Sequence, residues 1–334
     1  MKLASPTATA ALALAFGVAG SLPAGAAGPA PLERAREAAE HTAFQGVLHV
    51  RWRHGDAIRT ERLTVEAASG ALVVRGANQV MARPAAGRLV SHGGGRWEEM
   101  WLPSLVPAPR PDGSKYVTTD PFDGPPVAGR TTRVVELRHR GALLERLYLD
   151  AQTGLLLERD QFGAQGDVVR SLAFESLTVG DPGAPVADPP SNSHHGPKPV
   201  APEHLGRSAV APPSLDERYE RTGIYRDGSV LHVLYSDGVY DLSVFQQPGR
   251  LRRADVPSSG ERVAIGRATG WRYPWPGGQL VVWSSGGKVF TAVSDAPADQ
   301  VLAAARSLPP TGSAELSLLG KVRRACQALM EPLG

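Results

Sequence analysis

The chain has 334 residues, of which 36 are Lys or Arg and 33 are Asp or Glu, so its formal net charge is +3 at pH 7. So small a charge, without a dense basic patch, makes nucleic acid a poor candidate partner. The single cysteine, Cys326, cannot form a disulfide within the chain, so the fold must rest on apolar burial. A chain of this length builds such a core most readily as two domains.

The N-terminal residues have the pattern of a secretory signal. Lys2 is the only charge before Glu33, an apolar run covers residues 10–18, and Ala24-x-Ala26 fits a small-residue cleavage site. The alternative, a membrane anchor, needs an apolar run of about 20 residues, and this run is shorter. We therefore expect residues 1–26 to be a cleaved signal peptide and the mature protein to be periplasmic or otherwise extracytoplasmic.

Residues 27–180 have the pattern of a first domain made of one helix and many strands. Leu32, Ala35 and Ala38 recur at helical spacing, after which the apolar residues alternate with period two. Tight turns between successive strands predict antiparallel pairing. We expect an α+β fold with a strongly curved antiparallel half-barrel sheet and a covering helix. The expected strands are 44–52, 58–66, 71–75, 88–91, 133–137, 143–149, 155–160 and 168–179.

Residues 181–213 are dense in Pro, Gly and Ser and have no periodic apolar pattern, which predicts an extended linker. The pair His194–His195 lies inside this segment. No further ligands converge on it in the sequence, so the pair indicates a solvated linker rather than a metal site.

Residues 214–310 predict a second, smaller α/β domain. Ser236-Asp237-Gly238 is a hairpin turn between two alternating strands, and residues 297–307 have a helical apolar face that starts at a proline. The expected strands of this domain are 230–235, 239–245, 262–266, 278–284 and 288–293.

Residues 311–334 predict an amphipathic C-terminal helix. Its apolar side carries Cys326, which we expect to be a buried, inert thiol, and its other side carries Lys321, Arg323 and Arg324. Three destinations are open: packing on the second domain, peripheral contact with an anionic membrane surface, or docking in a groove of a partner.

The sequence contains no recognisable catalytic, nucleotide-binding or metal-binding motif. The aspartates of the first domain lie at turns or beside Gly and Pro, where their ordinary role is to accept hydrogen bonds from local backbone N–H groups. We therefore expect no catalytic residues, no metal and no cofactor, and interpret the protein as non-catalytic. These aspartates are Asp120, Asp123, Asp150, Asp160 and Asp167.

Two local concentrations of aromatic residues are candidate partner-binding surfaces. The first contains Trp97 and Trp101, and the second contains Trp271, Tyr273 and Trp275. Large aromatic side chains beside proline mark binding surfaces in some proteins and close the open end of a sheet in others. Both interpretations stay open at the level of the sequence.

An ordered set of short strings resembles the MucB/RseB family of periplasmic sigma-factor regulators. In the second domain the matching strings are 232–238 and 242–245, and the resemblance spans about residues 32–308. In the first domain they are Phe44-Gln-Gly46, Glu61-Arg62-Leu63, 126–130, 146–150, 153–157 and 168–177.

The resemblance implies a first domain similar to lipoprotein-localisation carriers, with a curved sheet around an apolar cavity. It also implies a regulator that binds the external part of a membrane anti-sigma factor and responds to a lipid-like ligand. The alternative is a lipid or lipoprotein carrier that uses the same cavity. Alternation along the strands selects the residues of the inward face, which would line either a cavity or a filled core. They are Trp52, Leu63, Val65, Val74, Leu147, Leu149, Leu157 and Phe174.

Overall fold

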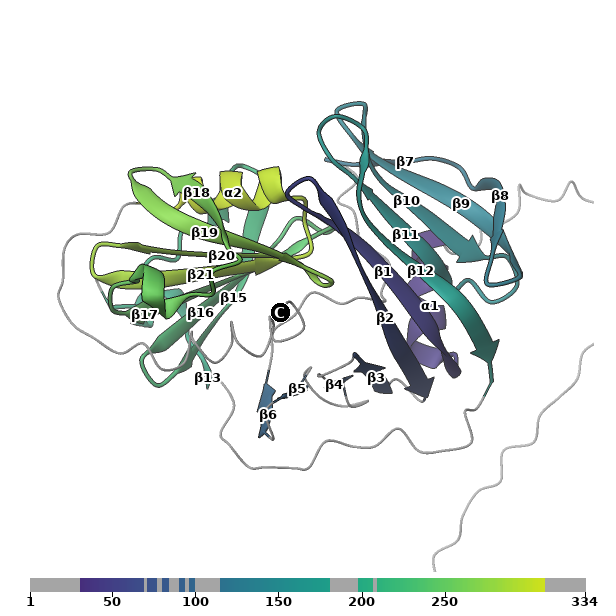
Figure 1. Ribbon diagram of the computed structural model, residues 1–334, viewed down its shortest axis with the longest axis horizontal. Coiled ribbons are helices and arrows are strands. Elements are labelled where there is room, and N and C mark those ends of the chain that lie inside the picture. The colour runs from purple at the N-terminus through teal and green to yellow at the C-terminus, as the bar shows by residue number, and fades with distance from the viewer. Residues whose placement is uncertain are drawn as a thin grey trace, which may run out of the picture. The chain divides into compact units, whose positions relative to one another are not determined.

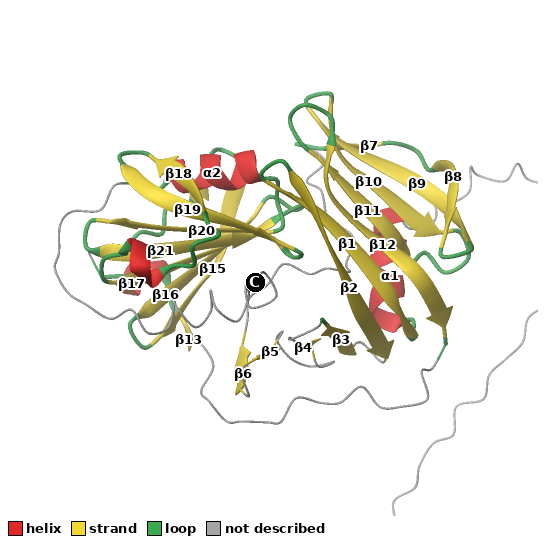
Figure 2. Cartoon of the chain, viewed as in Figure 1, coloured by secondary structure: helices red, strands yellow, loops and turns green. Residues whose placement is uncertain are grey.

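A computed structural model describes residues 31–68, 71–76, 80–83, 90–93, 96–99, 115–180, 198–206 and 209–309. The described residues form two α-helices, two short 3-10 helices and two antiparallel sheets (Figures 1 and 2). The mostly antiparallel α+β organisation agrees with the prediction. The strong curvature of the first sheet stays a prediction. The predicted signal peptide and C-terminal helix lie outside the described residues, as do 181–197 of the predicted linker.

Within the described residues the first sheet has twelve strands in the order β6-β5-β4-β3-β2-β1-β12-β11-β10-β9-β7, with β8 also paired to β9. It is a meander of neighbouring strands apart from the long-range pair between β1 and β12 and the pair between β7 and β9. The helix α1 (Pro31–His41) precedes it. The strands are β1 (Phe44–His54), β2 (Ala57–Ala68), β3 (Ala71–Arg75), β4 (Val80–Arg83), β5 (Val90–Gly93), β6 (Arg96–Glu99), β7 (Val117–Thr118), β8 (Phe122–Val127), β9 (Arg130–His139), β10 (Ala142–Asp150), β11 (Leu156–Phe162) and β12 (Val168–Val179).

The second sheet has nine described strands in the order β13-β15-β16-β17-β21-β20-β19-β18, with β14 paired to β15. The helix α2 (Ala298–Ser307) begins directly after Pro297, as predicted, and buries Val301 against the sheet. The strands are β13 (Lys198–Pro199), β14 (Ser214–Leu215), β15 (Tyr219–Asp227), β16 (Val230–Ser236), β17 (Asp241–Pro248), β18 (Glu261–Ile265), β19 (Ala268–Trp275), β20 (Gly278–Ser285) and β21 (Lys288–Ser294), with 3-10 turns η1 (Pro202–His204) and η2 (Arg253–Asp255).

Part of the predicted linker belongs to the second sheet. β13 pairs with β15, and the backbone N–H of Val200 donates to the carbonyl oxygen of Ile224 at 2.9 Å. Val210 is buried and its N–H donates to Gln246 Oε1 at 3.0 Å. Backbone groups that leave water need such partners, and here β15 and the Gln246 side chain of β17 supply them. The second sheet therefore begins at residue 198, inside the range 181–213.

The turns behave as their residue types predict. Asp237 Oδ1 accepts hydrogen bonds from the N–H groups of Val239 (2.9 Å) and Tyr240 (2.7 Å), which fixes the hairpin between β16 and β17. Asp150 Oδ2 likewise accepts from the N–H of Thr153 at 3.2 Å, and Gly154 adopts a φ of 83°, which glycine takes without steric cost.

The pair β1–β12 joins the two ends of the first domain, and Gly46 is a point of close approach between the two strands. A Cβ atom on Gly46 would overlap the carbonyl oxygen of Ser176 and would touch the ring of Phe174. The ladder passes through a register shift between Val47 and Leu48, directly beside this glycine. The close approach therefore requires a residue without a side chain.

We expect Gly46→Ala to destabilise the protein by about 1–3 kcal/mol, because the added methyl group overpacks the β1–β12 ladder. Thermal or urea unfolding measures the loss. Gly206→Ala is the matched control, since a Cβ at Gly206 meets no atom within 4 Å. Equal stability of Gly46→Ala and the control would contradict the predicted close approach.

Candidate functional site

One face of the first sheet is apolar over much of its width, and we call it the apolar face. Alternate residues of a strand point to the same side, so the register of the ladders decides which residues share it. All eight residues predicted for the inward face lie on it and are buried: Trp52, Leu63, Val65, Val74, Leu147, Leu149, Leu157 and Phe174. Their shared face agrees with the alternation, and a ligand there stays a prediction.

The apolar face packs as two adjoining clusters. Leu147 and Leu149 contact Leu32 and Ala35 of α1, so the helix lies against β9–β11. The other six predicted residues belong to a larger cluster, in which Phe174 meets the ring of Phe44 edge-on at 5.9 Å between centroids. Edge-to-face rings of this kind add stability beyond their buried area.

The apolar face ends in polar residues. The pairing register aligns Glu145, Gln161, Arg170 and Trp52 across four neighbouring strands, and Arg159 lies one row further in. These residues have the inward parity of the apolar residues on their own strands. The sheet therefore carries a row of buried polar and charged groups on its apolar side.

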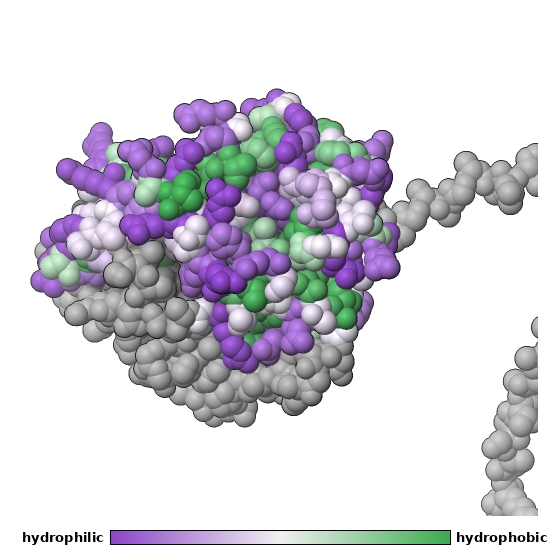
Figure 3. All heavy atoms as spheres, turned by 45° about the vertical axis from the view of Figure 1, so that its right-hand side comes forward, coloured by the Kyte–Doolittle hydropathy of each residue, from purple (hydrophilic) through white to green (hydrophobic). Residues whose placement is uncertain are grey.

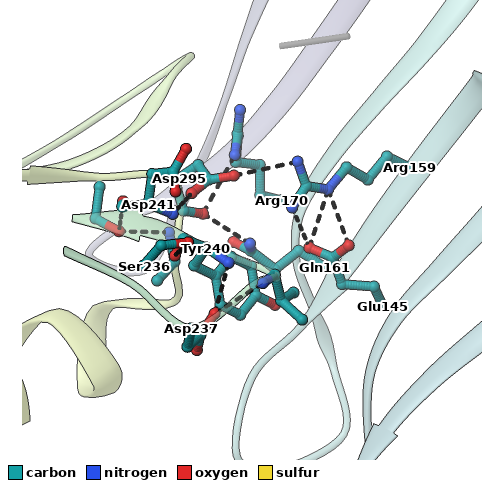
Figure 4. Close-up of polar contacts among 12 residues, drawn as sticks. Glu145, Arg159, Gln161, Arg170, Ser236, Asp237, Tyr240, Asp241 and Asp295 are labelled. Carbon is teal, nitrogen blue, oxygen red and sulfur yellow. Dashed lines mark hydrogen bonds and ion pairs between the residues drawn. The ribbon is translucent and has the colours of Figure 1, made fainter. Parts of the chain in front are cut away.

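These polar groups contact the second sheet in the region shown in Figure 4. The Arg159 guanidinium donates through Nε to both carboxylate oxygens of Glu145, at 2.9 and 3.0 Å, and through Nη1 to Asp295 Oδ2 at 3.2 Å. A single guanidinium thus joins a carboxylate of the first sheet to a carboxylate that directly follows β21. Planar, forked donors suit such a two-carboxylate arrangement.

Two further donors of the first sheet reach the same short segment. Gln161 Nε2 donates to the carbonyl oxygen of Asp295 at 2.8 Å, and Arg170 Nε donates to the carbonyl oxygen of Pro276 at 2.9 Å. Arg170 Nη1 also lies 3.4 Å from the Asp295 carbonyl oxygen. We call this set the polar junction: Glu145, Arg159, Gln161 and Arg170 from the first sheet, with Pro276 and Asp295 from the second.

The charges of the polar junction are almost fully buried. Exposed fractions are 0% for Glu145, 3% for Arg159 and Arg170, and 5% for Asp295. Burial raises the pKa of Asp295 to about 6, although Arg159 and Arg170 oppose the rise, so the carboxylate is ionised at neutral pH. Burial also lowers the pKa of Arg170 to about 10, with Arg159 adding repulsion, and leaves it charged. The formal charges of the two arginines and the two carboxylates therefore balance within the polar junction.

Two tyrosine side chains extend the polar junction on one side. Tyr116 donates to Asp237 Oδ2 at 2.5 Å, and its ring lies in the core cluster of the second sheet together with Leu137 and Leu144. The Arg159 guanidinium carbon lies 5.9 Å from the centre of the Tyr240 ring. Residues of the first sheet thus complete the core of the second.

The aromatic residues predicted to bind a partner differ in their burial. Tyr273 and Trp275 of β19 are buried, and the Tyr273 hydroxyl donates to the Pro257 carbonyl oxygen at 3.0 Å. These two rings pack in the core, which is the alternative that the sequence left open. Trp271 is half-buried beside the Arg253 guanidinium, at 5.8 Å from its carbon to the ring centre. The side chains of Trp97 and Trp101 lie outside the described residues.

The surface of the described residues offers no continuous apolar area in the view of Figure 3, where apolar side chains form separate patches among polar ones. Among the residues that the structure describes, four large apolar side chains are exposed: Ile58, Val117, Phe122 and Val168. Within the described part of the chain no three His, Cys, Asp or Glu residues are grouped to hold a metal ion. None of the described helices has the length and apolar character to cross a membrane.

No protein-family model matches the chain, and no curated protein matches it. The chain is similar in structure to MucB. A crystal structure of MucB shares 20% sequence identity over 84% of this chain and 96% of its own, with a TM-score of 0.45. The Pseudomonas aeruginosa MucA/MucB complex shares 20% identity over 85% of this chain and 98% of the matched chain, with a TM-score of 0.42. A LolA superfamily protein from Nitrosomonas europaea shares 10% identity over 86% and 93%, with a TM-score of 0.21.

The residues of the polar junction were not among the predicted site residues. A signal for them exists, because Glu145, Arg159 and Arg170 have the same strand parity as Leu147, Leu157 and Leu172. A charged residue at an inward position of an alternating strand needs a buried partner. The partner, Asp295, lies more than a hundred residues away along the chain, and no local pattern connects it to them.

On the opposite face of the first sheet, Glu158 is half-buried two residues from Asp160. Burial, reinforced by the charge of Asp160, raises the pKa of Glu158 from 4.5 to about 7. The folded protein therefore binds this proton more tightly than the unfolded chain does. The stability that follows is complete below about pH 4.5 and is lost as the pH rises through about 7.

We expect Glu158→Gln to melt at a higher temperature than the wild type at pH 8 and at the same temperature at pH 4.5. The gain at pH 8 should be about 1 kcal/mol, because solvent screens a half-exposed side chain. Calorimetry across this pH range measures it. Glu40→Gln, on the exposed side of α1, is the matched control for the loss of one carboxylate. A Glu158→Gln gain that is equal at both pH values would contradict the raised pKa.

Proposed function

We propose that the protein is an extracytoplasmic, non-catalytic regulator that binds the external part of a membrane anti-sigma factor in a stress sigma-factor pathway. We further propose that the apolar face of the first sheet accepts a lipid-like ligand. The observation that carries the proposal is the ordered set of MucB/RseB strings, which runs through both sheets rather than through one of them.

Several of these strings occupy positions with a structural requirement. Gly46 lies at the close approach of β1 and β12, and residues 146–157 contain the Asp150 turn with its glycine at positive φ. In the second sheet, residues 232–238 end in the Asp237 hairpin. The resemblance thus involves residues that set the backbone of both sheets, and such residues are the ones a shared fold would retain.

The pattern of residues 1–26 supports export, and the MucB/RseB resemblance agrees with a location outside the cytoplasmic membrane. A regulator at that location meets the external part of a membrane-spanning anti-sigma factor directly. MucB itself has been crystallised in complex with MucA(peri).

Burial of each CH₂ group of an acyl chain is worth about 0.8 kcal/mol, so an apolar face shielded by α1 suits such a ligand. The same property favours the alternative function, a lipid or lipoprotein carrier that uses this face for transport.

The partner test uses the mature chain, residues 27–334, and the external segment of a single-span anti-sigma factor from the same genome. We expect a dissociation constant of about 1 μM or below by calorimetry, which corresponds to about 8 kcal/mol. The external segment of an unrelated anti-sigma factor is the control. Absence of binding at roughly 100-fold higher concentration, with and without added phospholipid, would contradict the regulatory function and favour the carrier.

The ligand test fills the apolar face with a larger side chain. If the face encloses a lipid, Val65→Phe should keep the melting temperature and abolish lipid-sized adducts in native mass spectrometry. Val282→Phe, at a buried position of the second sheet, is the control and should cost about 1–3 kcal/mol through overpacking. A wild-type protein without adducts, together with a Val65→Phe variant as unstable as the control, would show a filled core.

A further inference from the structure

The contact between the two sheets differs in chemistry from the interior of each sheet. The cores are built from aliphatic and aromatic side chains, such as the cluster of Leu63, Val65 and Phe174. The polar junction instead buries two arginines and two carboxylates at 5% exposure or less. Charged residues are almost never buried to this degree unless they are paired, so their arrangement at this boundary needs a physical explanation.

The donors of the first sheet converge on one short segment of the second. Asp295 accepts hydrogen bonds from three of these donors. Arg159 donates to its carboxylate, and Gln161 and Arg170 donate to its carbonyl oxygen. The Asp295 carboxylate also faces the backbone N–H of Asp241 at 3.4 Å, so it is held by both sheets (Figure 4). Asp295 therefore accepts from three donors of the first sheet and is the centre of the polar junction.

Such a junction contributes specificity of position more than net stability. Removing paired charges from water costs about as much free energy as their mutual attraction returns, and well-packed apolar residues of similar volume are often as stable or more stable. In a separated state the same four charges would regain water. The free-energy difference between joined and separated sheets is therefore smaller than an apolar boundary of the same size would give.

Two buried hydroxyl groups at the junction strengthen this point. Tyr219 and Tyr240 are 0% and 1% exposed, and within the described residues neither hydroxyl oxygen has a hydrogen-bond partner. Both rings lie close enough to Asp237 and Asp295 for their charges to raise the pKa of each hydroxyl, although burial is the larger cause. A buried hydroxyl without a partner is costly, and separation of the sheets would return it to water.

Each sheet retains a core of its own if the junction opens. The first sheet keeps the two clusters of its apolar face, and the second keeps the cluster around Tyr273, Leu280 and Val282. Outside the junction, the described contacts between the sheets include the Tyr116–Asp237 hydrogen bond and one between the Gly55 N–H and Glu261 Oε1 at 2.9 Å. Lys115 Nζ also donates to the carbonyl oxygen of Arg218 and to Glu220 Oε1, at 3.1 Å each. Opening thus breaks these polar contacts and the packing of Tyr116, Leu137 and Leu144 on the core of the second sheet, and spares the clusters inside each sheet.

We propose that the Glu145–Arg159–Asp295 contact, supported by Arg170 and Gln161, is a polar latch through which the two sheets reversibly separate as folded bodies. The latch is a property of this chain and stands independently of the proposed function. Opening exposes the Asp295 segment and the hydroxyls of Tyr219 and Tyr240 while the strands of both sheets remain paired.

The test measures the distance between the sheets in the full mature chain. Spin labels are placed at Arg140→Cys, in the exposed β9–β10 turn, and Ser229→Cys, in the exposed β15–β16 turn, with Cys326→Ser to remove the native thiol. Arg159→Leu leaves Glu145 and Asp295 buried without their shared cation. We expect the ratio of separated to joined molecules to rise at least about tenfold, seen as a second, longer distance.

Arg130→Leu is the matched control. It breaks an ion pair of the same type, Arg130 Nη2 to Asp150 Oδ2 at 2.7 Å, inside the first sheet and away from the boundary. The control should keep the wild-type distance distribution. If Arg159→Leu also keeps it, the latch is overturned.

A second measurement needs no variant and covers the case in which Arg159→Leu does not fold. Hydrogen exchange of the wild type is measured in increasing urea. The Gly55 amide donates to Glu261 on the other sheet, so it should exchange through an opening whose free energy is well below that of global unfolding. Amides of the paired strands β1 and β20 should exchange only on global unfolding. If all of these amides exchange together in one global transition, no separate opening exists and the proposal fails.

Discussion

The contact between the two sheets is centred on the guanidinium of Arg159 and the two carboxylates that it joins. A buried cation requires anions at hydrogen-bonding distance, and here one anion, Glu145, comes from the same sheet and the other, Asp295, from the second. The attraction of Glu145 and Asp295 overcomes the effect of burial and holds the pKa of Arg159 above its ordinary value, so its charge is permanent. The relation between the sheets is therefore specified by a small number of directional contacts, together with the packing of Tyr116, Leu137 and Leu144 in the core of the second sheet.

The apolar face and the polar junction are two parts of the same surface. Along β10, Leu147 and Leu149 pack under α1, while Glu145, on the same side of the strand, reaches the junction. A change of packing at Leu147 would thus occur only two residues from Glu145, which belongs to the polar junction. In the proposed regulator, this continuity brings the ligand-binding surface close to the contact between the sheets.

Much of the strand pattern could be predicted from the sequence, because alternation and turn residues are local. The turn at Asp237, the helix after Pro297 and the shared face of the eight apolar residues all follow from spacing of a few residues. Two of the missed strands have obscured patterns. β8 contains Pro125 and Pro126, and β19 contains Pro274 between aromatic residues, so both segments resemble loops or surface patches in the sequence. Their strand conformation comes from pairing with β9 and β20.

The candidate site also has one part that follows from local sequence patterns and one part that depends on the tertiary structure. Local periodicity alone determined which side chains face the interior of the first sheet, since each strand's alternation is fixed by its backbone geometry. Only the tertiary structure decided that Tyr273 and Trp275 are core residues, and that Arg159 and Arg170 meet Asp295 across 136 and 125 residues of chain. Contacts between charges so far apart in sequence leave no periodic trace, because they arise when two separately patterned sheets come together and the buried charges must be paired.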